Sequence, residues 1–227
     1  MLRLIVIAAV LVSSASAACK CGPAQYMGGL GSVVGESTQP PLGLNVAEFG
    51  AWDFMNRRFG FKVDLVFSNG TSVSYRMIQN YTEGAQWIFI DEYKFCEKQK
   101  AVLPEPSNCI PETATSFGKL YVGGFSGSSD TLEVETWVNT ISEGTLMGSG
   151  SMTVRTKDCF PVGAQFMGTS TEMGPATAVV MSSGWYNMTE GIPHPEDWFT
   201  LPSYCNSQES NAVKRHPIPK LNFKRFF

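Results

Sequence analysis

Apolar and polar residues alternate with a period of two along much of the chain, which is the pattern of a β-strand with one buried face. The clearest case is residues 59–67, where Phe61, Val63, Leu65 and Phe67 alternate with mostly polar side chains. The turn dipeptide Asn69-Gly70 follows, and alternation resumes over residues 72–79. These two stretches predict a β-hairpin with a tight turn.

Further strands are predicted at roughly ten-residue spacing. Residues 132–138 alternate clearly, and residues 149–154, 164–168 and 177–181 are shorter candidates. Residues 85–98 predict a strand with Trp87, Phe89, Tyr93 and Phe95 on one face. Residues 45–58 fit either a helix or a strand hairpin around Asn56. Short strands separated by turn residues indicate an all-β sandwich or barrel-like sheet with little helix.

The first seventeen residues have the order of a secretory signal peptide. Arg3 precedes an apolar run over residues 4–12, and Ala15-Ser16-Ala17 has the small-x-small form of a cleavage site. The run is too short for a transmembrane helix, which needs about 20 apolar residues. We therefore expect residues 1–17 to be removed, and the alternative of a buried N-terminal strand is disfavoured. The mature chain would be secreted or lumenal, the lysosomal lumen included, and would not span a membrane.

Charge divides the mature chain into two parts. Residues 18–205 carry 11 Lys and Arg against 19 Asp and Glu, whereas residues 206–227 carry 5 against 1. The acidic body argues against nucleic acid as a partner, since phosphate binding needs a basic surface. We predict one β domain over residues 18–205 and a basic flexible tail over residues 206–227. Lys214-Arg215 leaves open whether this tail is processed.

Six cysteines lie in the mature chain, and their even number in a secreted protein predicts disulfides with 15 complete pairings. A zinc site is disfavoured because Cys19-Lys20-Cys21 lacks the two-to-four-residue gap of zinc knuckles and has no His nearby. A bridge that closes a loop of over one hundred residues stabilises by up to about 4–5 kcal/mol in the chain-entropy model. The six are Cys19, Cys21, Cys96, Cys109, Cys159 and Cys205.

Three sequons predict N-glycosylation at Asn69, Asn80 and Asn187, each followed two residues later by Thr. Catalytic signals are sparse. A Ser-His-Asp arrangement would have to use His194, which lies in the rigid stretch Gly191-Ile192-Pro193-His194-Pro195. Such a turn histidine is more often structural, and no metalloprotease, Walker A or nucleophile-elbow motif occurs. The sequence therefore predicts a binding protein and not an enzyme.

Aromatic residues on the predicted strands suggest a binding site. A curved sheet lined by aromatic rings can hold an apolar ligand in its concavity. The alternative is that these rings fill the core, where aromatic side chains are common. The candidate pocket residues are Trp87, Phe89, Tyr93, Phe95, Tyr121 and Phe125.

Four motifs in order along the chain resemble the ependymin-related family. They are Cys21-Gly22-Pro23-Ala24-Gln25-Tyr26, then Ile88-Phe89-Ile90-Asp91 before Cys96, then residues 154–162 with Cys159-Phe160-Pro161-Val162, and finally residues 191–195 with Phe199, Pro202 and Cys205. The chain departs from the family pattern at Tyr26, where a Trp is usual, and at His194-Pro195, where Asp-Pro is usual. It also offers two candidates, Cys19 and Cys21, for the opening cysteine.

The resemblance implies two curved antiparallel sheets that form a half-barrel or sandwich around an apolar pocket, similar to bacterial lipoprotein-carrier folds. It implies that the opening cysteine pairs with Cys159, that Cys96 pairs with Cys205, and that Cys109 takes the remaining partner. It further implies a homodimer, Ca²⁺ association without assignable ligands, a lipid or other hydrophobic small molecule as ligand, and contact with matrix components.

Two functions remain open at this point. The first is a secreted glycoprotein that carries a hydrophobic ligand in an apolar pocket, as a dimer. The second is a structural glycoprotein of the extracellular matrix or of cell adhesion, without a ligand pocket. A hydrolase using His194 or a carboxylate pair is a third, less favoured alternative.

Overall fold

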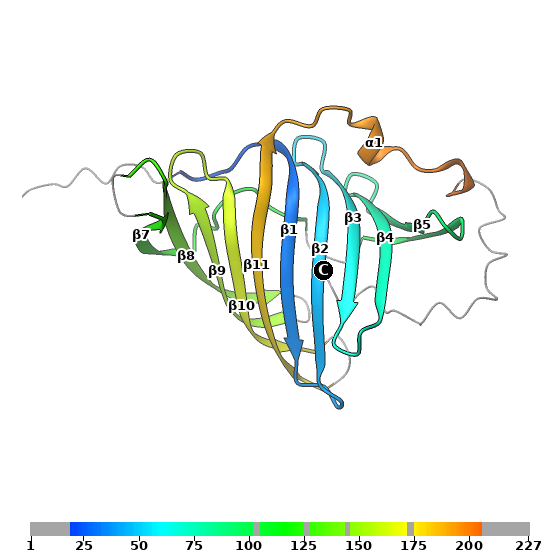
Figure 1. Ribbon diagram of the computed structural model, residues 1–227, viewed down its shortest axis with the longest axis horizontal. Helices are drawn as coiled ribbons and strands as arrows, with labels where there is room; N and C mark the ends of the chain where they lie inside the picture. Colours follow the sequence, from blue (N-terminus) through cyan, green and yellow to red (C-terminus); the bar gives the residue numbers. More distant parts are fainter. Residues whose placement is uncertain (1–18, 102–104, 125–127, 144–145, 172–174, 206–227) are drawn as a thin grey trace, which may run out of the picture.

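The computed structural model describes residues 19–101, 105–124, 128–143, 146–171 and 175–205, and these ranges contain eleven strands and two short helical segments (Figure 1). The predicted signal peptide, the basic tail and Phe125 lie outside the described residues. The strands are β1 (Gln25–Glu36), β2 (Leu42–Asp53), β3 (Arg58–Phe67), β4 (Ser72–Asn80), β5 (Ala85–Ile90), β6 (Phe95–Lys100), β7 (Thr115–Gly123), β8 (Thr131–Glu143), β9 (Leu146–Arg155), β10 (Pro161–Ser170) and β11 (Thr177–Glu190). The helical segments are α1 (Glu196–Phe199) and η1 (Ser203–Cys205).

All eleven strands form one antiparallel sheet in the order β6-β5-β4-β3-β2-β1-β11-β10-β9-β8-β7. The sheet consists of two up-and-down meanders, β1–β6 and β7–β11, which meet where β1 pairs with β11 (Figure 1). The predicted all-β antiparallel class is confirmed. The two predicted sheets are continuous with each other, because β1 forms a full ladder with both β2 and β11.

The hairpin predicted around Asn69-Gly70 is confirmed as β3 and β4, which pair from Arg58↔Asn80 to Val66↔Ser72. Gly70 has a φ of 82°, and the Asn69 side chain accepts a hydrogen bond from the backbone N–H of Thr71. Of the two alternatives for residues 45–58, the strand hairpin is confirmed. Strands β2 and β3 pair down to Asp53↔Arg58, and the turn between them contains Asn56.

Residues 85–98 form two strands instead of the single one-faced strand that the alternation predicted. The turn at residues 91–94 reverses the chain, and Lys94 adopts a left-handed φ of 47°. As a result Trp87 and Phe89 of β5 point to one face of the sheet, whereas Phe95 of β6 packs on the other. The polar run Asp91-Glu92, which favours a turn, separates the two aromatic pairs.

The sheet carries an apolar cluster on each face of the β1–β6 half. The inner cluster is large and rich in aromatic rings; it contains Tyr26, Leu44, Val46, Trp52, Phe59, Phe61, Val63, Leu65, Tyr75, Met77, Ile88, Ile90 and Phe160. The outer cluster contains Ile78, Ala85, Trp87, Phe89 and Cys96, packed against Leu201, Tyr204 and Cys205.

The segment after β11 covers this outer cluster. Its Trp198 lies so close to β3 that a Cβ on Gly60 would sit 2.5 Å from the Trp198 carbonyl oxygen, so only glycine fits there. Phe199 packs under the Arg58 guanidinium, 4.1 Å from the ring centre, and the Cys96–Cys205 disulfide fixes the end of the segment to β6. The segment after β11 therefore covers the outer face of β3–β6. The inner face remains as the place for a site.

Candidate functional site

A strap of extended chain, residues 105–110, runs between β6 at one edge of the sheet and β7 at the other, and it is fastened to the start of the domain. The Gly22 N–H donates to the Asn108 carbonyl at 2.7 Å, and the Ile110 N–H donates to the Lys20 carbonyl at 2.8 Å. The Cys21–Cys109 disulfide crosslinks the same two segments, which also form an isolated β-bridge. The strap and the N-terminal segment therefore form one unit.

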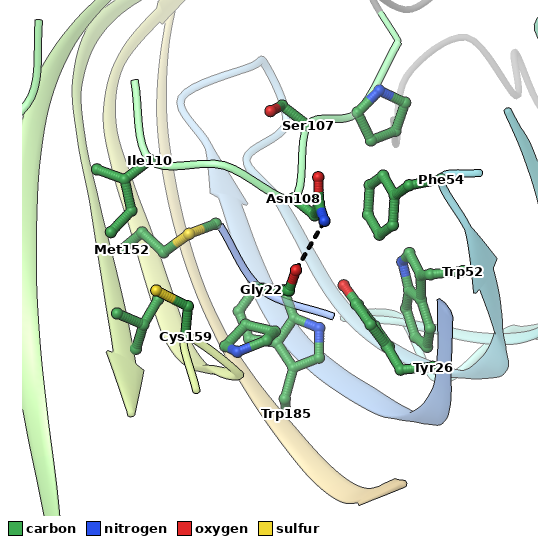
Figure 2. Close-up of a pocket in the computed structure, with 13 residues that line it drawn as sticks. Gly22, Tyr26, Trp52, Phe54, Ser107, Asn108, Ile110, Met152, Cys159 and Trp185 are labelled. Carbon is green, nitrogen blue, oxygen red and sulfur yellow. Dashed lines mark hydrogen bonds between the residues drawn. The ribbon is translucent and has the colours of Figure 1, made fainter. Parts of the chain in front are cut away.

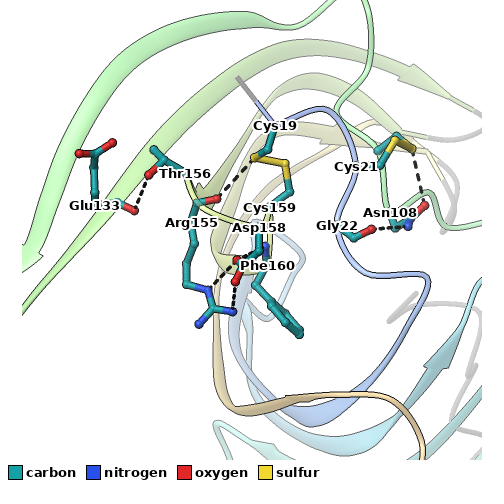
Figure 3. Close-up of a disulfide and its surroundings, with 11 residues drawn as sticks. Cys19, Cys21, Gly22, Asn108, Glu133, Arg155, Thr156, Asp158, Cys159 and Phe160 are labelled. Carbon is teal, nitrogen blue, oxygen red and sulfur yellow. Dashed lines mark hydrogen bonds and ion pairs between the residues drawn. A yellow bond between two sulfur atoms is a disulfide. The ribbon is translucent and has the colours of Figure 1, made fainter. Parts of the chain in front are cut away.

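A second disulfide, Cys19–Cys159, ties this unit to the turn between β9 and β10 (Figure 3). The turn is ordered by Arg155, which donates two hydrogen bonds to the Asp158 carboxylate at 2.9 and 2.7 Å. The Arg155 guanidinium also lies 4.6 Å from the centre of the Phe160 ring, and Phe160 belongs to the inner cluster. The two disulfides thus connect the strap to both halves of the sheet.

The structure confirms the disulfides, and their pairing agrees with the family resemblance. Cys19 is the opening cysteine that pairs with Cys159, Cys96 pairs with Cys205, and Cys21 is the remaining partner of Cys109. The bridges span 140, 109 and 88 residues of sequence, respectively.

A pocket of about 150 Å³ lies beneath the strap (Figure 2). Tyr26, Trp52 and Phe54 form an aromatic wall in which the Tyr26 and Trp52 rings stack at 5.0 Å between centres. Met152 and Ile110 lie on the opposite wall. The full lining is Gly22, Tyr26, Trp52, Phe54, Pro106, Ser107, Asn108, Ile110, Met152, Val154, Cys159, Pro161 and Trp185.

The sheet must curve toward this face, because one pocket has walls from β2 and β9, which are separated by three strands in the sheet order. We call this face the concave face. A pocket of about 150 Å³ with mainly apolar walls has room for a group of about the size of benzene. The arrangement is therefore suited to binding an apolar group, with few polar atoms to fix its orientation.

Two polar side chains mark the pocket. The Asn108 side-chain amide donates to the carbonyls of Gly22 and Pro23 at 2.8 and 3.2 Å, which holds the strap in place. The Trp185 indole N–H is buried and has no hydrogen-bond partner within the described ranges. Burial raises the pKa of Tyr26, so its phenol remains neutral and contributes an uncharged surface.

The structure does not bring together the five predicted pocket residues that it describes. Trp87 and Phe89 are buried in the outer cluster, and Phe95 packs at the edge of the inner one. Tyr93 lies in an exposed turn and Tyr121 on the exposed strand β7, each 48% exposed. Only part of the lining that sequence reasoning missed lies close to a cysteine in the chain; for example, Gly22 and Tyr26 follow Cys21, and Val154 and Pro161 flank Cys159. For those residues the cysteines were the available signal, whereas Trp52, Phe54 and Trp185 gave none.

The three sequons lie on turns or on an exposed strand. Asn69 is exposed between β3 and β4, and Asn187 is exposed on β11 with a left-handed φ of 52°. The side-chain carbonyl of Asn80 accepts from the backbone N–H groups of Thr82 and Glu83 at 3.0 and 3.2 Å. Glycosylation of these residues stays a prediction.

His194 lies in a surface turn, where its side chain is 76% exposed and Nδ1 is 3.3 Å from Glu196 Oε1. It is not among the residues that line the pocket. Throughout the described ranges, no three His, Cys, Asp or Glu side chains gather as a metal site would require, so none of these residues can be assigned to Ca²⁺. In the same part of the chain, no helix has the length and hydropathy needed to cross a bilayer.

Known proteins resemble this chain at different levels. Development-specific protein LVN1.2 from Lytechinus variegatus is 36% identical over 184 residues, which cover 77% of this chain and 94% of that protein. The crystal structure of a DUF1329 family protein from Desulfovibrio piger covers 77% of this chain and 89% of its own, with 8% identity and a TM-score of 0.31, too low to carry an argument. The Ependymin family model matches residues 69–205. Together with the relative in Lytechinus variegatus, this match shows that the chain belongs to the Ependymin family.

Proposed function

We propose that this protein is a secreted glycoprotein that binds a hydrophobic, lipid-like ligand on the concave face, and that it acts by binding and not by catalysis. The observation that carries the proposal is the pocket beneath the strap, whose walls are mainly aromatic and aliphatic. Membership of the Ependymin family and three disulfides fit an extracellular protein, because disulfides persist in oxidising compartments.

A direct test is native mass spectrometry of the protein secreted from a eukaryotic host, followed by organic extraction. We expect a co-purifying apolar molecule. A ligand-free species that also fails to bind added fatty acids or alcohols would contradict the proposal.

A matched pair of variants locates the binding site. Met152 on β9 lines the pocket, whereas Met167 on the neighbouring strand β10 is 67% exposed. Met152→Trp fills the pocket and should weaken binding of a fluorescent fatty acid by about tenfold or more, which corresponds to about 1.4 kcal/mol. Met167→Trp is the control and should leave affinity unchanged. Equal effects of the two substitutions would place the ligand elsewhere.

Homodimerisation is part of the proposal. Strand β7 is an edge of the sheet, and Phe117, Leu120 and Val122 on it are 78, 52 and 48% exposed. An exposed apolar edge strand is a ready surface for pairing with another chain. Analytical ultracentrifugation should give a dimer for the native chain and a monomer for Leu120→Lys. A native monomer would remove this part of the proposal.

Calcium association is proposed without assigned ligands. Addition of Ca²⁺ should then raise the thermal midpoint relative to equal Mg²⁺, since a ligand that binds only the folded state stabilises it. An unchanged midpoint at millimolar Ca²⁺ would contradict it.

A structural role in the matrix or in adhesion is the second candidate function. A diagonal stripe of exposed apolar side chains crosses four strands on the outer face, where Met167 lies directly opposite Val180. Val33, at 59% exposure, and Met147, at 61%, extend the stripe on β1 and β9. Binding to extracted matrix that is lost in Met167→Glu, or on removing residues 206–227, would favour this role. If neither change affects binding to the matrix, that result would count against this role.

A further inference from the structure

A single carboxylate lies in the middle of the inner cluster. Glu48 is on β2, and its side chain points to the concave face together with Leu44, Val46 and Trp52, which are two or four residues away along the strand. Its neighbours across the two ladders are Leu30 on β1 and Val63 on β3. Glu48 is only 7% exposed although its surroundings are almost entirely apolar.

The Glu48 carboxylate has no partner within the described part of the chain, where no side chain donates a hydrogen bond to it or forms an ion pair with it. The nearby cations point to the outer face. Lys62 of β3 lies over the Trp198 ring, and Arg76 of β4 donates to the Asp197 carbonyl. Asp64 also points outward, where it accepts a hydrogen bond from Ser74.

On β1, β3 and β4, the titratable groups that share the concave face with Glu48 are few. Tyr75 on β4 lies near enough for the Glu48 charge to raise the pKa of its phenol, together with the larger effect of burial. Tyr26 and Glu36 lie at the two ends of β1. On β11, the concave residues nearest to Glu48 are Trp185 and Ser183, and neither side chain titrates. No cation of the described chain can therefore compensate Glu48.

An unpaired buried carboxylate is costly, because burial disfavours its charged form. In agreement, burial raises the pKa of Glu48 to about 7. A residue that breaks the rules of core packing without a compensating contact is expected mainly at functional sites. Glu48 is such a residue.

Glu48 does not line the pocket itself, but it lies in one row across the sheet with a residue that does. Trp185, which lines the pocket, lies opposite Leu30, and Leu30 lies opposite Glu48. Neighbouring strands are about 4.8 Å apart, so about 10 Å of sheet separates Glu48 from Trp185. Trp185 on one side and Tyr75 on the other give aromatic rings flanking a carboxylate, which is the combination that attracts organic cations.

We propose that the ligand is a cationic amphiphile, with its apolar body in the pocket and a positively charged nitrogen recognised by Glu48. The inference rests on the proposed function and narrows the class of hydrophobic ligand. The ammonium group supplies the missing charge partner, and the aromatic residues Trp185 and Tyr75 lie two strands away on either side of Glu48.

Three probes of equal chain length test this inference: dodecylamine, dodecanol and dodecanoate, titrated below their micelle concentrations against tryptophan fluorescence. The proteins are the native chain, Glu48→Gln, and Glu190→Gln as a control at an exposed acid on β11. At about pH 8, where Glu48 is mostly charged, the native chain should bind dodecylamine about tenfold more tightly than dodecanol. The control should behave like the native chain, and Glu48→Gln should lose the preference yet keep its affinity for dodecanol.

The preference of the native chain should also shrink at about pH 5.5, where a carboxyl with a raised pKa is protonated. This measurement keeps the test valid if Glu48→Gln folds poorly. Equal affinities for amine and alcohol, tighter binding of dodecanoate, or a preference that persists in Glu48→Gln would overturn the inference while leaving the proposed function intact. Binding of none of the three probes would overturn both.

Discussion

The two halves of the sheet have the same topology but differ in how they are packed. In the β1–β6 half, bulky side chains such as Phe59, Leu65 and Met77 are fully buried on the concave face, and the segment that carries α1 covers much of the outer face. In the β7–β11 half few side chains are buried, Val134, Val154 and Phe166 among them. Strand β7 is exposed at every position except Gly118.

The two halves of the sheet contribute unequally to the stability of the fold. Since apolar burial is the dominant favourable contribution to folding, most of the stability must come from the β1–β6 half. The β7–β11 half supplies one wall of the pocket through Met152 and Val154. Substitutions of one kind should therefore have different effects in the two halves.

The largest difference is expected for Phe59→Ala. This ring is 0% exposed and packs edge-on against Phe54 and Tyr81. Its removal should lower the free energy of unfolding by about 3–5 kcal/mol. Phe117→Ala, on the exposed strand β7, should change it by about 0.5 kcal/mol or less. Denaturant unfolding of both variants measures the contrast, and similar losses would show that the two halves contribute equally.

Glu48→Gln should raise the free energy of unfolding, whereas Phe59→Ala lowers it. Because its folded pKa lies above the unfolded value, the folded state binds more protons between about pH 4.5 and 7, and stability falls as pH rises through that window. The substitution should stabilise the protein by about 3 kcal/mol near pH 8 and by almost nothing near pH 4.5. Unfolding curves at the two pH values measure this, and a pH-independent difference would mean that Glu48 is not buried alone.

Asp53→Ala should cost about 2 kcal/mol, the smallest of these core effects. Burial alone would raise the pKa of Asp53, but hydrogen bonds from Asn56, Gln25 and Arg58 lower it below its usual value. Its stabilisation is present above the unfolded pKa and is lost as pH falls through the folded one. Asp64→Ala, at an exposed acid on β3, is the control and should cost less near neutral pH.

Hydrogen exchange tests the comparison without substitutions. Backbone amides of β7 and β8 should exchange faster than those of β3 and β4, because local opening is easiest where few apolar contacts hold a strand. Peptide-resolved mass spectrometry can compare the pairs in one experiment. Equal protection across the sheet would mean that it opens only as a whole.

Strands were predicted most reliably where bulky apolar residues alternate with polar ones. Strands β3 and β4 were found because every second side chain is mostly apolar and buried or partly buried, and the turn at Asn69-Gly70 fixed their register. Strand β8 was found from its alternation alone, although Leu132 on it is exposed. Strand β1 was missed because its glycines interrupt the pattern. One of them, Gly29, leaves room for the Tyr186 ring, since a Cβ there would lie 2.1 Å from it, a contact that only the folded structure reveals.

The site was less accessible to prediction than the fold. The cysteine count indicated disulfides, but the pairing came from the family resemblance and not from spacing. The pocket residues were not found, because its walls join Trp52 of β2 to Met152 of β9, and local alternation holds no information on such distant neighbours. Glu48 was overlooked for a related reason: in sequence it is one acid in an alternating stretch, and its isolation is a property of the assembled sheet.

The pairing of β1 with β11 has a consequence for how the chain folds during synthesis. Tyr26 pairs with Glu190, so one edge of the first strand must wait for more than 160 residues before its partner emerges. Such long-range pairings slow folding, and unpaired edges are prone to aggregation in the interval. The β1–β6 meander, built from short hairpins, can form first and would keep the growing chain compact. Its exposed β1 edge is then the surface that a folding helper would need to protect.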